Sequence, residues 1–123
     1  NTYLRSPGML DRYYRLIADE LIAFAGQMTG VEGYMESTAS GLVAGVALAK
    51  ALLGEPEPDF TGDTVLGALA LHVTTPTGDF QPMNATFGVM APLEGKKIRV
   101  KKERYAKVAE RSLEKIAEIV NEL

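Results

Sequence analysis

The stretch GQMTGVEGYMESTASGLVAGVALAKALLG, residues 26–54, decides the fold, because a glycine-rich turn runs directly into a long series of small and apolar residues. This pattern predicts a helix that begins within residues 33–36. We expect it to end at Leu53, because Gly54 and two nearby prolines cannot continue it. A long helix after a glycine turn is therefore the first element that the sequence predicts.

Two glycines within this helix require an explanation. Gly41 and Gly45 each cost a helix about 1 kcal/mol relative to alanine. Together with Ser37 they recur every four residues, and they form a stripe of small side chains on which another backbone can lie. The alternative interpretation is that the glycines of this region serve only turns and close packing.

The residues before the glycine turn predict a strand. Residues 21–25 are five apolar residues in a row, ended by Gly26, which is typical of a strand buried on both faces in a parallel sheet. The sequence contains no second strand of this character, so we expect the remaining strands to lie in residues that this chain lacks. Residues 1–20 predict loops, with a turn at Ser6-Pro7-Gly8.

Two further helices are predicted in the second half. A short helix spans residues 65–73, and either Asp63 or Thr64 can cap it. Residues 74–93 contain several prolines and predict an irregular, packed loop. The last helix runs over about residues 97–122, where apolar residues recur with a period near 3.6, so one face packs on a core.

Composition excludes several classes of protein. The chain has 123 residues, a net charge of −3, one histidine and no cysteine, which excludes a disulfide framework, a thiolate metal site and a zinc cluster. We expect no metal and a cytoplasmic location. The longest apolar run, residues 41–53, is interrupted by Lys50 and is shorter than the roughly 20 residues that span a bilayer, so we expect no membrane contact.

The glycine turn is the first candidate site. A turn that enters a helix offers backbone N–H groups and partial positive charge to an electron-rich ligand. The spacing of Gly26, Gly30 and Gly33 lacks the G-x-G-x-x-G order that binds a diphosphate. Glu32 and Glu36 would repel phosphate, but their carboxylates could accept hydrogen bonds from ligand hydroxyls.

A basic segment is the second candidate site. Between Glu94 and Arg111, eight basic residues oppose three acidic ones, a local net charge of +5 that could hold RNA phosphates. The alternative is a solvated helix face, with Glu103 and Lys107 paired one turn apart. The RNA-binding candidates are Lys96, Lys97, Arg99, Lys101, Lys102 and Arg104.

Two amides in the predicted loop are the third candidate. Gln81 and Asn84 each carry two donors and an acceptor, which could recognise a pterin or uracil edge. The alternative is that they hold the loop by bonding its backbone. His72, the lone histidine, is expected to be structural.

Three stretches together resemble a known family. FAGQMTGVEGYMES at residues 24–37, followed by ASGL at 39–42, resembles the C-terminal flavin-binding segment of the glucose-inhibited-division family of tRNA-modifying flavoproteins. FQPMNATFG at 80–88 resembles a signature of its folate- and FAD-dependent tRNA (uracil-5-)-methyltransferase branch, and KKERY at 101–105 resembles the closing helix of that branch. The other branch makes carboxymethylaminomethyl uridine at the wobble position.

The resemblance implies a fold and a cofactor. It implies an α/β, Rossmann-like FAD protein of which residues 1–123 form one C-terminal portion, mostly helical with one or few strands. Residues 1–54 would be the last strand and helix of the FAD-binding domain, and 55–123 a helical extension. It also implies FAD contacts, with Tyr34 beside the reactive ring; the contact residues would be Gly26, Gln27, Gly30, Val31, Glu32, Gly33 and Tyr34.

The resemblance further implies methylation of the T-loop uridine of tRNA at C5, with methylenetetrahydrofolate and NAD(P)H as cosubstrates. The chain lacks the dinucleotide fingerprint and the reactive cysteines of the family. We therefore assign no catalytic residue, and we expect the missing N-terminal part of the protein as a partner. Three alternatives to this interpretation stay open: the wobble-uridine branch, a non-catalytic RNA-binding or scaffold module, and self-association through strand edges.

Overall fold

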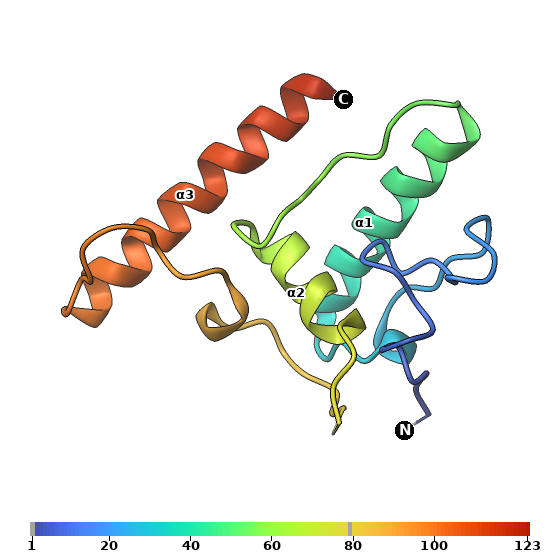
Figure 1. Cartoon of the computed structure of the whole chain (residues 1–123), viewed down its shortest axis with the longest axis horizontal. Coiled ribbons are helices and arrows are strands. Elements are labelled where there is room, and N and C mark those ends of the chain that lie inside the picture. The colour runs from blue at the N-terminus through green and yellow to red at the C-terminus, as the bar shows by residue number, and fades with distance from the viewer. Residues whose placement is uncertain (1, 79) are drawn as a thin grey trace.

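The computed structural model describes residues 2–78 and 80–123, which form helices joined by long irregular segments (Figure 1). Helix α1 spans Tyr34–Leu52, α2 spans Val65–Thr74 and α3 spans Lys101–Glu122. Two single 3-10 turns, η1 at Gln27–Thr29 and η2 at Phe87–Val89, lie in the connecting segments. Helix α2 lies between α1 and α3 in Figure 1. None of the helices that the structure describes has the length and hydropathy to cross a membrane.

Helix α1 confirms the helix predicted after the glycine turn. Gly33 is its N-cap, and the helix ends one residue before the predicted Leu53. It buries Ser40, Val43 and nearby alanines against α2 and the core. The predicted close approach of a backbone at the glycine stripe is absent, because a Cβ at Gly41 or Gly45 would meet no atom of the described residues within 4 Å.

Helix α2 also confirms its prediction, and Thr64 is the residue that caps it. The Thr64 hydroxyl accepts a hydrogen bond from the Gly67 N–H at 3.0 Å and donates one to the Phe60 carbonyl at 2.7 Å. Leu69 and Val73 of α2 are at most 1% exposed and form the centre of the core. A polar cap at the start and apolar residues at helical spacing were sufficient to locate this element.

The strand predicted at residues 21–25 is wrong. No strand occurs in the described residues, and this segment makes only isolated pairings with residues 14–16. The Leu16 N–H bonds the Ile22 carbonyl at 2.8 Å. Ile22 is 44% exposed, so the segment is not buried on both faces. A strand requires neighbours for its backbone groups, and none of the described segments forms a ladder with it. The described residues are mostly helical and do not confirm the α/β class.

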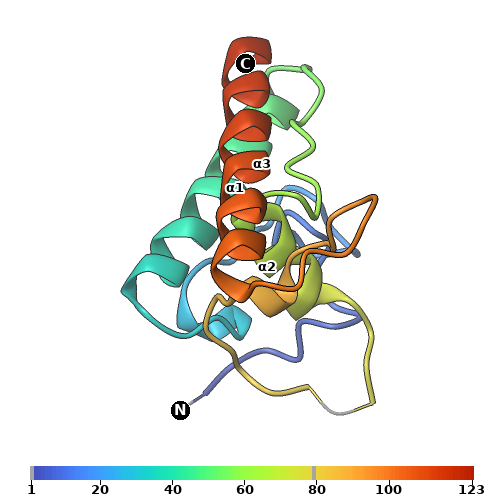
Figure 2. The same cartoon turned by 90° about the vertical axis from the view of Figure 1, so that its left-hand side faces the viewer.

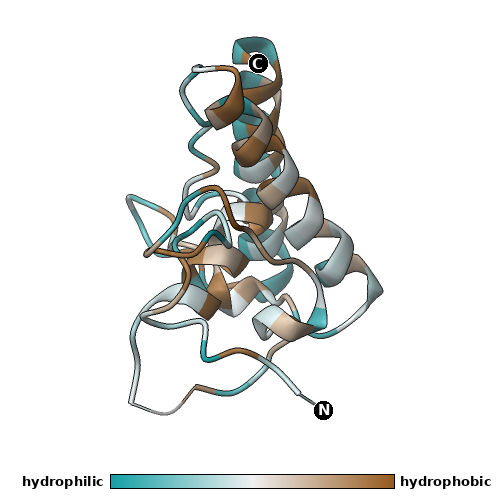
Figure 3. Ribbon diagram, turned by 90° about the vertical axis from the view of Figure 1, so that its right-hand side faces the viewer, coloured by the Kyte–Doolittle hydropathy of each residue, from teal (hydrophilic) through white to brown (hydrophobic). Residues whose placement is uncertain are grey.

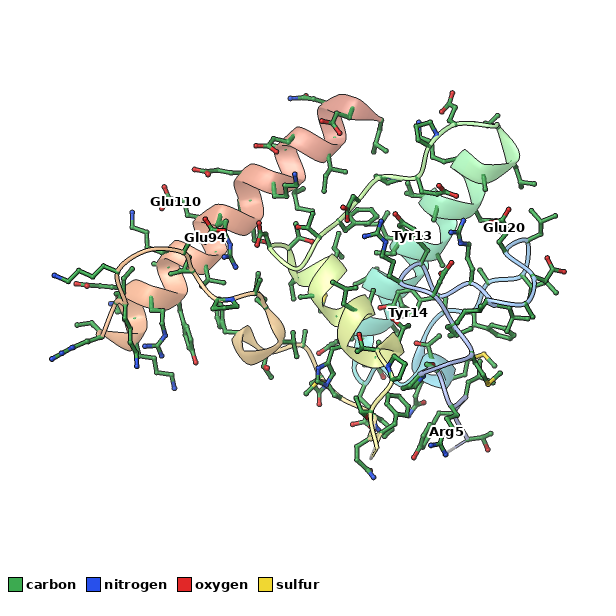
Figure 4. The ribbon with its side chains drawn as sticks, viewed as in Figure 1. Arg5, Tyr13, Tyr14, Glu20, Glu94 and Glu110 are labelled. Atoms are coloured by element: carbon green, nitrogen blue, oxygen red, sulfur yellow. The ribbon has the colours of Figure 1, made fainter. Side chains whose placement is uncertain are left out.

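A buried arginine joins the N-terminal loops to the segment after α1. Arg15 is 7% exposed, and its guanidinium bonds the Asp11 carboxylate at 2.9 Å and the Glu57 carboxylate at 2.7 Å. It also lies 4.8 Å from the centre of the Tyr13 ring, which Figure 4 labels beside Tyr14 near the middle of the molecule. The hydrogen bond from Arg15 lowers the pKa of Glu57 from its ordinary value of 4.5.

Replacing Glu57 with glutamine is expected to destabilise the chain at neutral pH by about 1 kcal/mol, because it removes a charged partner of Arg15 that is only partly shielded from water. Since folding lowers the pKa of Glu57, its stabilising effect is complete above the ordinary pKa and disappears as the pH falls through the lowered value. The stability difference between the two proteins should therefore shrink as the pH falls below the ordinary pKa of 4.5.

Denaturant unfolding across this pH range measures the effect of Glu57→Gln. The matched control is Glu55→Gln, because Glu55 pairs with Lys50 at 2.7 Å but is 51% exposed, so its loss should change stability little. Equal losses for the two variants, or a difference that does not depend on pH, would contradict the role given to Glu57.

Helix α3 begins four residues later than predicted, at Lys101. Val100 has an extended backbone, and the Arg104 guanidinium bonds the Ile98 carbonyl at 3.3 Å, so the chain enters the helix from a turn. The predicted apolar face is confirmed in part, because Val108 and Ile119 are buried but Leu113 is 71% exposed. Arg111 fixes the helix to the preceding loop by bonding the Pro92 and Ala91 carbonyls. Figure 2 shows α3 from the side, running along the molecule.

Candidate functional site

The glycine turn consists of η1 and the glycines around it. Gly26 and Gly30 flank η1 with φ of 79° and 102°, and Gly33 precedes α1 with φ of 113°. Side chains other than glycine rarely adopt such angles. The Gly26 N–H donates to the Ser40 hydroxyl at 2.7 Å, which fastens the turn to α1.

The segment around Met83 pairs with this turn. The Met83 N–H bonds the Gly30 carbonyl and the Glu32 N–H bonds the Met83 carbonyl, both at 2.9 Å. These two bonds make a parallel bridge between Val31 and Met83. The turn and the 80–88 segment, which lie about 50 residues apart in sequence, are thus side by side.

The Phe80 ring covers Gly30. A Cβ built on Gly30 would lie less than 3.0 Å from this ring, so the ring would have to shift to admit a side chain there. Tyr3 meets Phe80 edge-on, with ring centres 5.9 Å apart. The absence of a side chain at Gly30 therefore allows the aromatic ring to pack on the turn.

Glu36 links the start of α1 to the same segment. Its carboxylate accepts the Ala85 N–H at 2.9 Å and the Asn84 amide at 3.4 Å, and that amide also donates to the Glu32 carbonyl at 2.5 Å. The bonds from the Ala85 N–H, from its own N–H and from Asn84 hold the pKa of Glu36 below its ordinary value. The carboxylate is therefore ionised at neutral pH, and it lies where a helix N-terminus would otherwise attract a phosphate.

The predicted cofactor residues lie together but differ in what they expose. Val31 is fully buried, backbone and side chain alike, whereas Tyr34 is 95% exposed. Gly26 has open space where a Cβ would lie. The backbone N–H and carbonyl of Gly26 are already paired with Ser40 and Thr29, so its open side and the exposed Tyr34 ring suit contact with a flat, uncharged ring system. The Glu36 carboxylate argues against a phosphate at the start of α1.

The predicted substrate residues lie in the segment that pairs with the turn. Gln81 is exposed, and Asn84 binds the Glu32 carbonyl and the Glu36 carboxylate. The Asn84 amide nitrogen thus holds the loop to the start of α1, which was the alternative interpretation of this residue. His72 is exposed near the end of α2.

The predicted RNA-binding residues cluster around the start of α3. Figure 4 shows nitrogen-tipped side chains spreading outward there, with the acidic Glu94 and Glu110 labelled beside α3. Tyr105 stacks on Phe87, with ring centres 4.2 Å apart, and Lys101 and Arg104 each lie 5.4 Å from the Tyr105 ring. Five of the six candidates are exposed and Arg104 is partly buried: Lys96, Lys97, Arg99, Lys101, Lys102 and Arg104. Arg111, counted in the basic segment, is instead paired with Asp63 at 3.5 Å.

Sequence reasoning missed the contacts that hold the site. Glu36 was considered only for ligand binding, although a glutamate in the first turn of a helix is a common partner for nearby N–H groups. Ser40 and Phe80 gave no local signal, because each acts on a residue far away in sequence. The described residues contain no group of three metal-ligating side chains.

An apolar hollow of about 340 Å³ lies between the 85–90 segment, the start of α2 and the middle of α3. Phe87 and Met90 form one wall, and Leu113 of α3 forms another. It is separate from the glycine turn except through Ala85, which lines the hollow and whose N–H binds Glu36.

Comparison with known proteins adds independent evidence. The family model "Glucose inhibited division protein A" matches residues 1–56. The methylenetetrahydrofolate–tRNA-(uracil-5-)-methyltransferase TrmFO of Streptococcus uberis is 50% identical over 122 residues, which are 98% of this chain and 28% of that protein. The protein of the same name from Lactococcus lactis subsp. cremoris is 49% identical over 98% of this chain and 27% of its own length. That of Staphylococcus haemolyticus is 51% identical over 93% of this chain and 26% of its own length. The chain thus spans just over a quarter of the length of these relatives.

Proposed function

We infer that the chain belongs to the glucose-inhibited-division family, and on that premise we propose that it is the C-terminal part of a flavoenzyme that methylates the T-loop uridine of tRNA at C5. The observation that carries the proposal is identity of about 50% to relatives of that activity over 98% of this chain, which includes both the glycine turn and the 80–88 segment. The family match over residues 1–56 supports a division of the chain near residue 54, with a helical extension after it.

The glycine turn is the proposed flavin-contacting surface. Gly26 and Gln27 would face the cofactor, Tyr34 would lie against its ring, and Glu32 and Gly33 would complete the contacts. Gly30 and Val31, which are buried, would hold the turn in place behind this surface. Transfer of a methyl group from methylenetetrahydrofolate requires two electrons, because the donated carbon is at the oxidation level of formaldehyde, and a reduced flavin recharged by NAD(P)H supplies them. The residues of this chain position the cofactor and exclude phosphate from the start of α1.

Substrate contacts are proposed at two other places. Gln81 and the carbonyl of Asn84 would meet the pterin or the uracil beside the turn. The basic residues at the start of α3 would hold tRNA phosphates, which positions RNA without reading its sequence. Because the proposed substrate is tRNA, we propose that the protein acts in the cytoplasm.

Two other functions would use the same surfaces. The wobble-uridine branch shares the glycine turn, but the relatives that align across residues 80–88 carry the methyltransferase name. A non-catalytic RNA-binding module would use the basic segment alone. Hydrogen bonds with Ser40 and Met83 hold the glycine turn in a fixed shape, which supports a cofactor-contacting role over such a module. The chain lacks cysteine, so it would supply contacts to the cofactor but no thiol nucleophile.

A chimera tests the proposal. This chain replaces its aligned segment in the Streptococcus uberis relative, and the purified chimera is mixed with tRNA, NAD(P)H and methylenetetrahydrofolate labelled in its one-carbon unit. We expect bound flavin and labelled 5-methyluridine in the digested tRNA. A folded, flavin-containing chimera that leaves tRNA unlabelled would contradict the proposal.

Neutralising the basic segment should weaken tRNA binding by the chimera. For Lys96→Ala combined with Lys97→Ala and Lys102→Ala, we expect the slope of log K against log salt to fall by about 0.7–0.9 for each phosphate that the variant no longer binds. Filter binding at several salt concentrations measures the slope. The matched control is Lys115→Ala, because Lys115 lies further along α3 and pairs with Glu118 at 3.4 Å. Unchanged slopes in the triple variant would exclude this segment from the RNA interface.

A further inference from the structure

The outer face of helix α1, the side turned away from the core, carries no charged residue along the described helix. Its members recur every three or four residues and therefore lie on one side of the helix. They are Met35, Thr38, Leu42, Gly45, Ala49 and Leu52. Met35 is 79% exposed, Leu42 is 52% exposed and Leu52 is 68% exposed. In Figure 3 this helix is coloured from pale to brown along most of its length.

Helix α3 of the same chain provides the comparison. Most of its exposed positions are charged, and they include Lys102, Glu103, Lys107, Glu110, Glu114 and Glu118, although Leu113 and Val120 are also 71% and 59% exposed. The charged positions are the ordinary pattern of a helix face in water. Helix α1 is apolar on both faces, which is typical of a helix that is covered on both sides.

The two glycines of α1 also indicate that its outer face is covered. Gly45 is exposed and Gly41 is partly exposed, and a Cβ at either would meet nothing in the described structure. Each glycine nevertheless costs the helix about 1 kcal/mol. A second backbone that approaches from outside would give these two glycines a function, because only glycine permits so close an approach.

We propose that the outer face of α1 is the surface on which the rest of a longer polypeptide packs. This inference rests on the proposed function, in which the chain is one part of a protein as long as its relatives. Those relatives are more than three times as long as the aligned stretch, so the residues needed to cover the face exist within the same molecule. The family match includes all of α1 but none of α3, so the apolar face lies in the part that the wider family shares.

The size of the face argues against a second copy of this chain as the occupant. A helix of 19 residues is about 28 Å long and 10 Å wide, so one face offers roughly 300 Å². A stable interface between separate proteins buries about 800 Å² on each partner. A small face is sufficient when the covering segment belongs to the same polypeptide, because the covalent connection keeps the two surfaces together.

The test compares the isolated chain with the Streptococcus uberis chimera. Leu42→Glu and Ala49→Glu place a carboxylate on the outer face of α1. In the isolated chain both residues meet water, and the melting temperature should change little. In the chimera the carboxylates would be buried without partners, and the melting temperature should fall by about 5 °C or more. The matched control is Ala106→Glu on α3, at an exposed position one turn from the exposed Lys102 and Glu110, which should have little effect in either protein.

Each outcome is informative. A fall confined to the α1 variants of the chimera supports the proposal. Equal effects in the two proteins, or an equal fall for Ala106→Glu, would overturn it. So would an isolated chain that sediments as a dimer and is split by Leu42→Glu while the chimera is unaffected, because the occupant would then be a second copy. Methylation by the unmodified chimera tests the proposed function separately.

Discussion

Replacing Gly67 with alanine is expected to destabilise the isolated chain by about 3 kcal/mol or more, because the new methyl group has no room. Gly67 is buried in the first turn of α2, and a Cβ there would lie less than 3.0 Å from the Thr61 carbonyl oxygen and from backbone atoms of Phe60. These are main-chain atoms, which cannot rotate away as a side chain would. Helix α2 would have to move off the preceding loop. Denaturant unfolding measures the loss.

The matched control for this substitution is Gly45→Ala on the open side of α1. A Cβ at Gly45 meets nothing within 4 Å, so the higher helix propensity of alanine should stabilise the isolated chain by about 0.5–1 kcal/mol. Opposite signs for the two variants are the expected result. A small or favourable effect of Gly67→Ala would show that α2 does not pack on residues 60–61 as described.

Local patterns predicted the helices because each depends on neighbouring residues. Gly54 and the prolines that follow it predicted the end of α1 to within one residue. Thr64 caps α2 with its hydroxyl, as the position of this residue before the helix predicted. The start of α3 was placed four residues too early. The charged residues after Gly95 have good helix propensity, and no local signal marks the turn that Arg104 stabilises through the Ile98 carbonyl.

The wrong strand has a different cause. Residues 21–25 are apolar enough for a buried strand, but a strand is defined by partners rather than by its own composition. In this chain the segment pairs with residues 14–16 instead and leaves Leu21 58% exposed.

The sequence predicted only part of the candidate site, because the site too depends on partners that are distant in sequence. The glycine turn is a local signal, whereas its contacts with Phe80 and Ala85 join residues about 50 positions apart.

Replacing Gly30 with alanine is expected to destabilise the isolated chain by about 2–3 kcal/mol. Two costs combine: the left-handed backbone at φ of 102°, which costs an ordinary residue about 1–2 kcal/mol, and the displacement of the Phe80 ring that covers this position. In the chimera the same change should reduce flavin content, because Phe80 and Met83 lie in the segment that pairs with the turn. Denaturant unfolding and the visible flavin absorption measure the two effects.

Two further variants separate the two costs. Gly26→Ala meets the same kind of backbone strain, at φ of 79°, but its Cβ would have open space, so it should cost only about 1–2 kcal/mol. In the Gly30→Ala, Phe80→Ala double variant the ring is gone, and the alanine should cost less than it does beside Phe80, a coupling that a double-mutant cycle reports. If Gly30→Ala is no more costly than Gly26→Ala and shows no coupling to Phe80, the ring does not pack on the turn. The turn and the 80–88 segment would then be joined by backbone pairing and the Glu36 contacts alone, and the flavin-contacting surface would have to be redrawn without Phe80.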